Sequence, residues 1–299
     1  MTSRQIQTVV PAVAAADGAG VRLYRSLGSQ QGQRFDPFLM LDEFFSDDPG
    51  DYIAGFPSHP HRGFETVTYM LDGHMRHEDS FGNRGDLGPG DVQWMTAARG
   101  IIHSEMPQQE SGRLRGFQLW INLPAKEKMK PAAWQDIAAA RIPVLPLVGG
   151  GEARVIAGTF EQDGLRHAGP IGGLSTEPWY FDLRLPAGAT LQVPLPLGHH
   201  AFLYLYEGAA VVGRDQPLPV RAASLLTDGD SIDLRAGAAG ARLLLLAGKP
   251  IGEPVVQYGP FVMNSREEIE QAIADYQAGR LVSPDAAAPA SGSSRTTTR

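Results

Sequence analysis

Four polar side chains within the first 105 residues have the types and spacing of metal ligands: His59, His61, His103 and Glu105. Residues two apart on an extended strand point to the same side, so His59 and His61 present their imidazoles together, and His103 and Glu105 form a matching pair. Two such strands facing each other would surround one divalent ion. Three imidazoles and one carboxylate fill four positions of an octahedron and leave two open, which predicts a catalytic metal centre.

A simpler interpretation treats these histidines as loop residues that bind water or backbone carbonyls. For a His-x-His pair standing alone, that interpretation would be preferred. Here the pair His59 and His61 precedes a predicted strand, and the pair His103 and Glu105 follows a tight glycine corner at residues 98–100. The matched pairs therefore favour the metal site.

Composition excludes several other classes of protein. The chain has no cysteine, so any metal ligands must be histidines and carboxylates, which favours a catalytic metal over structural zinc. Its 26 basic and 33 acidic residues give a net charge of −7 without any basic run, which argues against nucleic acid or an anionic membrane as a direct ligand. The first residues lack the apolar core of a signal peptide, and the longest apolar run is far shorter than the roughly 20 residues of a membrane span. We therefore expect a cytoplasmic protein.

The elements that would position the ligands are short strands. Abundant glycine (35) and proline (23) divide the chain into segments too brief for long helices. Alternating apolar and polar residues predict strands, and Asp72-Gly73 predicts a hairpin turn between two of them. Many short strands with frequent turns are typical of a jelly-roll sandwich or barrel. The predicted strands are residues 20–26, 65–71, 74–79, 92–96 and 114–123.

The length of 299 residues suggests two domains, and the second half repeats the first in outline. Residues 202–208 resemble residues 66–73, whereas residues 124–146 are polar and irregular, as expected of a surface segment near a domain boundary. We predict a metal-binding barrel at residues 1–145, a second barrel at residues 146–282 and a flexible tail at residues 283–299. The tail lacks aromatic residues and is rich in Ala, Ser, Pro and Thr.

One helix is predicted, at residues 264–279. Ser265 and Glu268 have the spacing of a capping box at its start, and Gly279 provides the stop. Ile269, Ala272 and their neighbours at helical spacing form one apolar face. This face should pack on a sheet.

Longer motifs resemble those of a known family. Gly55, the string His59-x-His-x3-Glu65 and Gly73 resemble the first cupin motif, and Gly100-x2-His103 resembles the second. Five fuller strings resemble the pirin family within the cupins. They are His59-Pro-His-Arg-Gly-Phe-Glu65, Gly90-Asp-Val-Gln-Trp-Met-Thr-Ala97, Gly100-Ile-Ile-His-Ser-Glu-Met106, Gln118-Leu-Trp-Ile-Asn-Leu-Pro124 and Gln257-Tyr-Gly-Pro-Phe-Val-Met-Asn264.

The pirin resemblance implies an all-β bicupin, with two tandem jelly-roll barrels and one metal ion in the first. The implied ion is Fe(II), although Mn, Co, Ni, Cu or Zn would also suit the ligands. In pirins the ligands occupy the positions of His59, His61, His103 and Glu105. In many other cupins the carboxylate is the first-motif glutamate, here Glu65, whose even separation from His61 would let it face the same way on one strand. We follow the pirin pattern and give Glu65 a supporting or structural role.

The remaining histidines do not suggest a second metal site. His199 and His200 are adjacent, so on a strand they would point to opposite faces. His74, His77 and His167 have no matching partners in the sequence, and we expect them to be solvated or hydrogen-bonded. Most aromatic residues should belong to the core, with one or two lining a cavity over the metal. These are Phe38, Phe44, Phe45, Phe56, Trp94 and Trp120.

The resemblance also implies an activity, because bacterial members of the family are associated with quercetin dioxygenase. A flavonol would bind the ion through its 3-hydroxyl, Glu105 would take the proton, and O2 would cleave the ring with loss of CO. The alternative is a non-enzymatic, redox-responsive iron protein that binds a transcription factor or a metabolic enzyme. We expect a monomer, because the sequence contains no coiled-coil pattern.

Overall fold

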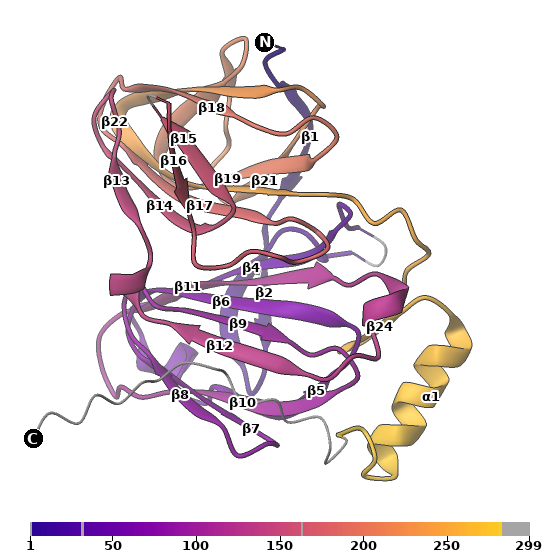
Figure 1. Cartoon of the computed structure of the whole chain (residues 1–299). Coiled ribbons are helices and arrows are strands. Elements are labelled where there is room, and N and C mark those ends of the chain that lie inside the picture. Colours follow the sequence, from indigo (N-terminus) through magenta and orange to yellow (C-terminus); the bar gives the residue numbers. More distant parts are fainter. Residues whose placement is uncertain (1, 31–32, 163, 283–299) are drawn as a thin grey trace, which may run out of the picture.

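The chain folds into two stacked β-barrels, drawn one above the other in Figure 1. The structure is a computed structural model that describes residues 2–30, 33–162 and 164–282. The predicted all-β class, the two cupin barrels and the single helix are confirmed. The predicted flexible tail, residues 283–299, lies outside the described residues.

The first barrel is built from two antiparallel sheets. Its seven-stranded sheet has the order β12 (Ala133–Ile137), β9 (Val92–Thr96), β6 (Phe64–Asp72), β11 (Leu114–Asn122), β4 (Phe38–Ser46), β3 (Val21–Arg25) and β2 (Val13–Asp17). Its four-stranded sheet has the order β5 (Phe56–His61), β10 (Ile101–Pro107), β7 (Met75–Asp79) and β8 (Arg84–Leu87). Short 3-10 helices lie at η1 (Pro49–Asp51), η2 (Ala125–Glu127) and η3 (Ala139–Arg141).

The second barrel is formed by a nine-stranded sheet that curves around a core of its own. The main path is β1 (Ile6–Pro11), β21 (Ala222–Leu226), β19 (His200–Val212), β22 (Ser231–Gly248), β17 (Trp179–Leu185), β14 (Glu152–Ala157) and β13 (Val144–Pro146). In addition, β18 (Thr190–Pro194) pairs with β22 and β20 (Gln216–Pro217) pairs with β19, while β15 (Thr159–Gln162) and β16 (Leu165–Ala168) form a separate hairpin.

Both ends of the described chain cross to the other barrel. Near the N-terminus, β1 pairs with β21 of the second barrel. Near the C-terminus, the hairpin of β23 (Val256–Tyr258) and β24 (Phe261–Met263) and the helix α1 (Arg266–Gln277) lie beside β5 of the first barrel (Figure 1). There the Arg62 guanidinium donates to the Asp275 carboxylate at 2.8 Å. The domain boundary at residue 145 stays a prediction. Wherever the boundary lies, the two terminal segments connect the barrels to each other.

The predicted helix is confirmed as α1, and its start follows from the capping box. The Ser265 hydroxyl accepts a hydrogen bond from the Glu268 amide, and the Glu268 carboxylate accepts one from the Ser265 amide. Beyond the last turn, Gly279 has a φ of +68°, which glycine adopts without strain. Ile269 and Ala272 are buried against the β23–β24 hairpin.

The predicted hairpin at Asp72-Gly73 is wrong. β6 pairs with β9 and β11, whereas β7 pairs with β8 and β10 in the opposite sheet. Gly73, with a φ of +85°, turns the chain from one sheet to the other. A turn dipeptide marks a reversal of direction but does not specify which strand will be the partner.

Residues 124–146 lie largely at the surface, as expected, but they are more regular than their composition suggests. β12 forms the edge of the seven-stranded sheet beside β9, and the polar run around η2 contains a fully buried ammonium group on Lys128. This ammonium donates to three oxygen atoms, those of Gly63, Asn122 and Val262. A buried cation with all three donors used ties the segment to β6 and to the C-terminal hairpin.

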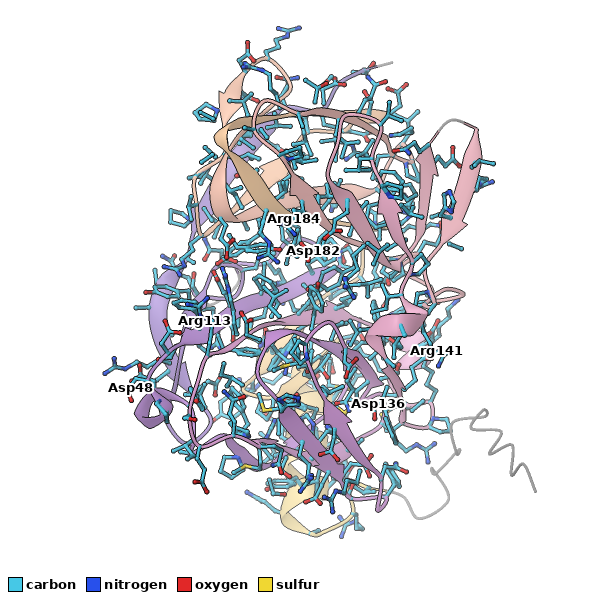
Figure 2. All side chains as sticks on the ribbon, turned by 90° about the vertical axis from the view of Figure 1, so that its left-hand side faces the viewer. Asp48, Arg113, Asp136, Arg141, Asp182 and Arg184 are labelled. Atoms are coloured by element: carbon cyan, nitrogen blue, oxygen red, sulfur yellow. The ribbon has the colours of Figure 1, made fainter. Side chains whose placement is uncertain are left out.

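The seven-stranded sheet is covered on both faces. Alternate residues such as Val67 and Tyr69 pack against Phe202 and Tyr204 of the second barrel, and side chains fill the junction (Figure 2). Residues between them, such as Thr68, point into the first barrel. The sheet thus serves as the wall between the second barrel and the interior that contains the predicted ligands.

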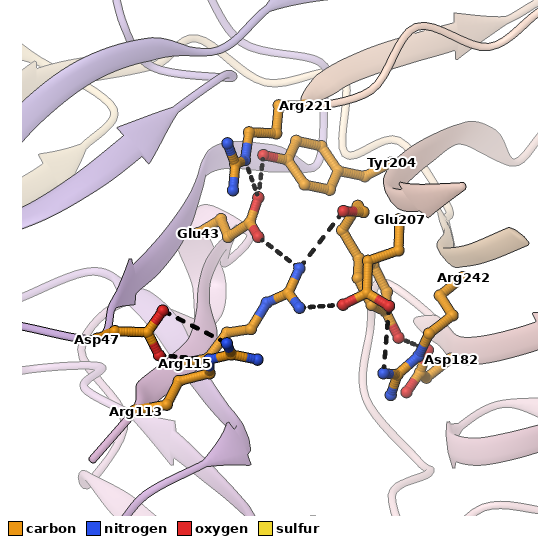
Figure 3. Close-up of polar contacts among 10 residues, drawn as sticks. Glu43, Asp47, Arg113, Arg115, Asp182, Tyr204, Glu207, Arg221 and Arg242 are labelled. Carbon is orange, nitrogen blue, oxygen red and sulfur yellow. Dashed lines mark hydrogen bonds and ion pairs between the residues drawn. The ribbon is translucent and has the colours of Figure 1, made fainter. Parts of the chain in front are cut away.

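Polar contacts also cross this junction (Figure 3). Arg115 lies between Glu43 and Glu207, and its guanidinium donates to Glu43 at 3.0 Å. The Asp182 carboxylate accepts hydrogen bonds from the hydroxyls of Tyr69 and Tyr206 at 2.7 and 2.6 Å. These pairings satisfy charges that burial would otherwise destabilise.

Candidate metal centre

Three of the four predicted ligands come together inside the first barrel. His59 and His61 lie on β5, and the antiparallel pairing with β10 puts His103 directly opposite His59. One ring nitrogen from each histidine lies within 4.8 Å of the other two. The period-two alternation of the strand and this register are sufficient to bring the three rings together.

Unpaired nitrogens indicate that these histidines fit a metal ion. Nδ1 of His61 and Nε2 of His103 are buried and have no hydrogen-bond partner among the described residues. His59 uses its Nδ1 at 2.8 Å from the Pro57 carbonyl, which leaves its Nε2 as the nitrogen for a ligand. Buried polar atoms without partners are rare, and a shared cation would satisfy them.

The electrostatics of the site also suit metal binding. Burial is the main reason that the pKa values of His61 and His103 lie well below the usual 6.5, and neighbouring imidazoles lower them further. Histidine must be neutral to coordinate a metal. The site therefore holds two potential ligands in the form that a cation needs.

Glu105 lines the same cavity but is held by other residues. Its Oε1 accepts a hydrogen bond from the Thr68 hydroxyl at 2.8 Å, and its Oε2 accepts one from the Gln118 amide at 2.9 Å. Its carboxylate oxygens are not part of the cluster formed by the nitrogens of His59, His61 and His103. Each carboxylate oxygen keeps a further lone pair. Coordination by Glu105 stays a prediction, and the carboxylate is oriented beside the histidines.

Glu65 faces the other way. β5 ends at His61, Gly63 has a φ of +94°, and β6 begins at Phe64 in the opposite sheet, so the even spacing from His61 has no meaning across this break. Glu65 lies opposite Thr96 on the face that carries Val67, and its Oε1 accepts a hydrogen bond from the Thr96 hydroxyl at 2.6 Å. Burial raises its pKa, although this hydrogen bond opposes the shift. The geometry gives Glu65 a structural position at the junction of the barrels.

His77, for which the sequence offers no matching partner, lies beside His103 in the structure. It is fully buried on β7, and its Nδ1 lies 3.1 Å from Nδ1 of His103. The other nitrogen of His77 faces the Asp79 carboxylate at 3.9 Å. The signal in the sequence was the alternation of Met75, His77 and Asp79, which puts all three on one side of β7.

The cavity above the histidines has a volume of about 600 Å³, which lies in the usual range for small-molecule sites. Phe44, Phe56 and Trp120 are among its apolar walls, so three aromatic residues line it where one or two were expected. Thr68, Gln118 and Glu105 are among its polar groups. The lining thus offers both apolar surface and hydrogen-bonding groups to a small molecule.

The two histidines that are adjacent in the sequence of the second barrel contact different residues. His199 Nε2 lies 3.8 Å from the Glu177 carboxylate, while His200 stacks on Phe35 and places its Nδ1 2.5 Å from the Asp36 carbonyl. Within the described ranges, His59, His61 and His103 form the single group of three or more potential ligands. None of the helices in these ranges is long and apolar enough to span a membrane.

Two jelly-roll barrels, of which one encloses a buried cluster of histidines, define a bicupin. Family comparison refines this class: residues 20–121 match the family described as Pirin, and residues 180–282 match the Pirin C-terminal cupin domain. The chain belongs to the pirin family.

Individual relatives agree with this assignment. A Pseudomonas aeruginosa protein with the provisional name quercetin 2,3-dioxygenase is 58% identical over 89% of this chain and 94% of its own length. The pirin-like protein of Caulobacter vibrioides is 50% identical over 94% of this chain and 100% of its own. Among solved structures, a quercetin 2,3-dioxygenase from Acinetobacter baumannii has a TM-score of 0.84 and 34% identity, and covers 93% of this chain and 98% of its own.

Proposed function

We propose that this protein is a metal-dependent dioxygenase that opens the ring of a flavonol such as quercetin with O2 and releases CO. The observation that carries the proposal is the set of three converging histidines, two with unpaired buried nitrogens, beside the oriented carboxylate of Glu105. The names of the P. aeruginosa and A. baumannii proteins support the choice of substrate.

His59, His61 and His103 would hold the ion, with Glu105 as the proposed fourth ligand. From the family resemblance we propose Fe(II), and Mn, Co, Ni, Cu or Zn remain chemically suitable. A bound ion would supply Lewis acidity and a template for the substrate oxygen and O2. His77 would fix the orientation of His103.

Glu105 is the proposed general base. Thr68 and Gln118 donate to its two oxygens, which fixes the carboxylate while leaving lone pairs for a substrate hydroxyl. A base must come within hydrogen-bond reach of the proton that it removes, and the proposal is supported by Glu105 lining the same cavity as His59 and His61. Apolar residues such as Phe44 and Trp120 would hold the aromatic rings and exclude water.

Metal removal and restoration provide the test. The purified protein should lose turnover on chelation and regain it with added Fe(II), followed as loss of flavonol absorbance and release of CO under oxygen. His61→Ala should abolish turnover, and His167→Ala in the β15–β16 hairpin serves as the control. If the metal-free protein still consumes quercetin, the proposal is wrong. Bound iron without turnover on any flavonol would support the regulatory alternative instead.

A further inference from the structure

A row of polar side chains crosses the inner face of the seven-stranded sheet, with one residue on each of four neighbouring strands. Thr68 on β6 lies opposite Gln118 on β11, which lies opposite Asp42 on β4, which lies opposite Arg25 on β3. All four line the cavity. Neighbouring strands are about 4.8 Å apart, so the row extends about 14 Å from Thr68 to Arg25.

Apolar residues border this row on both sides. Met40 lies opposite Trp120 on one side, and Leu23 lies opposite Phe44 on the other. All four of these side chains also line the cavity. Polar side chains buried among apolar residues destabilise the fold unless they form hydrogen bonds. The row therefore needs hydrogen-bond partners along its whole length.

The near end of the row already has its partner. Thr68 and Gln118 donate to Glu105, the proposed base. This end therefore lies beside Glu105, and Asp42 and Arg25 lie two and three strands away from Thr68 in the same sheet.

The far end keeps unused hydrogen-bonding capacity. The Arg25 guanidinium binds both oxygens of Asp42, at 2.8 and 2.6 Å, and one oxygen of Asp17 at 2.6 Å. These bonds use three of its five N–H donors, and each Asp42 oxygen retains a lone pair. The Asp42 side chain is only 3% exposed, and that of Arg25 is 21% exposed. The pair can both donate to and accept from a group in the cavity.

We propose that Arg25 and Asp42 are specificity-determining residues that bind a hydroxyl group on the end of the aromatic substrate remote from Glu105. This inference rests on the function proposed above and narrows the substrate to polyphenols with a hydroxylated distal ring. A phenolic hydroxyl can donate to Asp42 and accept from Arg25 at the same time. One guanidinium faces two carboxylates here, those of Asp42 and Asp17, so a substrate carboxylate would be repelled.

A purely structural role for the pair makes a different prediction. Arg25 and Asp42 join β3 to β4, so an ion pair that only stabilised this edge would affect all ligands equally. A binding role instead changes the preference between ligands that differ only in the distal hydroxyls. The ratio of the affinities for two such ligands therefore distinguishes a binding role from a structural role.

Equilibrium binding without oxygen gives this ratio independently of turnover. Quenching of protein fluorescence in the metal-loaded protein would compare quercetin, with two distal hydroxyls, and galangin, with none. We expect wild type to bind quercetin at least tenfold more tightly. The double variant Arg25→Met/Asp42→Leu replaces the ion pair with apolar groups of similar volume, a change that is often tolerated, and should bring the two affinities to within about twofold.

Two further variants complete the test. Asp42→Asn should lower the ratio while retaining the shape of the side chain, so the proposal stays testable if the double variant does not fold. Arg22→Gln, on the exposed side of β3, should leave the ratio unchanged. Equal affinities of wild type for both flavonols, or a tenfold preference that persists in the folded variants, would overturn the proposal. The assay measures binding and does not require catalysis. A protein that shows the expected ratio of quercetin to galangin affinity but has no dioxygenase activity would therefore contradict only the dioxygenase proposal.

Discussion

The Nδ1 atoms of His103 and His77 lie 3.1 Å apart in the interior of the first barrel. If His103 uses Nε2 for a metal, its Nδ1 carries the proton and donates to His77. His77 must then carry its own proton on Nε2, which lies 3.9 Å from the Asp79 carboxylate, beyond hydrogen-bond distance. Asp79 is itself held by the amides of Phe81 and Asn83. His77 is thus positioned to accept the Nδ1 proton of the His103 tautomer that suits coordination.

Loss of this support should weaken metal binding without removing a ligand. We expect His77→Phe to reduce metal affinity by 10- to 100-fold, because His103 loses its orienting acceptor while keeping Nε2. Competition with a chromophoric chelator measures the change. His74→Phe, at an exposed position just before β7, is the matched control. An unchanged affinity in His77→Phe would show that packing alone orients His103.

Glu105 and Glu65 should respond differently to the same substitution. Glu105→Gln removes the proposed base and should lower kcat by about 10²- to 10⁴-fold. Glu65→Gln keeps an acceptor for Thr96 at the junction and should retain both metal and turnover. Metal content and kcat of the two variants are the measurements. The opposite result, with metal lost only in Glu65→Gln, would contradict the assignment of the carboxylates.

The pH dependence of stability should reveal the buried carboxylate of Asp42. Burial raises its pKa to about 6, although Arg25 opposes the shift. Arg25 stays charged throughout, because pairing with Asp42 and Asp17 outweighs the effect of burial on its pKa. The folded state therefore binds the Asp42 proton more tightly than the unfolded chain does, and this contribution to stability is present below about pH 4 and is lost as the pH rises through about 6.

Comparison with the variant Arg25→Met/Asp42→Leu isolates this contribution. Between pH 4.5 and 7, metal-free wild type should lose about 2 kcal/mol of unfolding free energy relative to the variant. Urea denaturation of both proteins at a series of pH values provides the measurement. Parallel pH profiles would mean that Asp42 has the same proton affinity in the folded and unfolded states.

Local patterns were sufficient to predict that His59 and His61 point to the same side of one strand, whereas the position of His103 opposite them depends on the pairing of β5 with β10. His59 and His61 share a side of β5 because alternation along a strand is a property of adjacent residues, and the capping box of Ser265 and Glu268 is equally local. The same reasoning failed for Glu65 because the chain changes sheets at Gly63. Counting residues across such a break gives no information about which way a side chain points.

Sequence patterns did not predict the features that depend on contacts between segments far apart in the chain. The pairing of β1 with β21 joins segments more than 200 residues apart. The polar row needs the register of four strands, and His77 meets His103 only because β7 pairs with β10. Long-range register is set by the packing of the whole barrel, which one strand does not encode.

Lys128 should couple the stability of the first barrel to its metal site. Its buried ammonium binds the carbonyls of Gly63 and Val262 and the side chain of Asn122, so Lys128→Met would leave three buried acceptors unpaired. We expect a loss of about 3 kcal/mol in unfolding free energy. Because Gly63 lies two residues after His61, release of the C-terminal hairpin should also weaken metal binding. Denaturation and chelator competition measure both effects, with the exposed Lys126→Met as control. A loss below 1 kcal/mol would show that water replaces the ammonium at these acceptors.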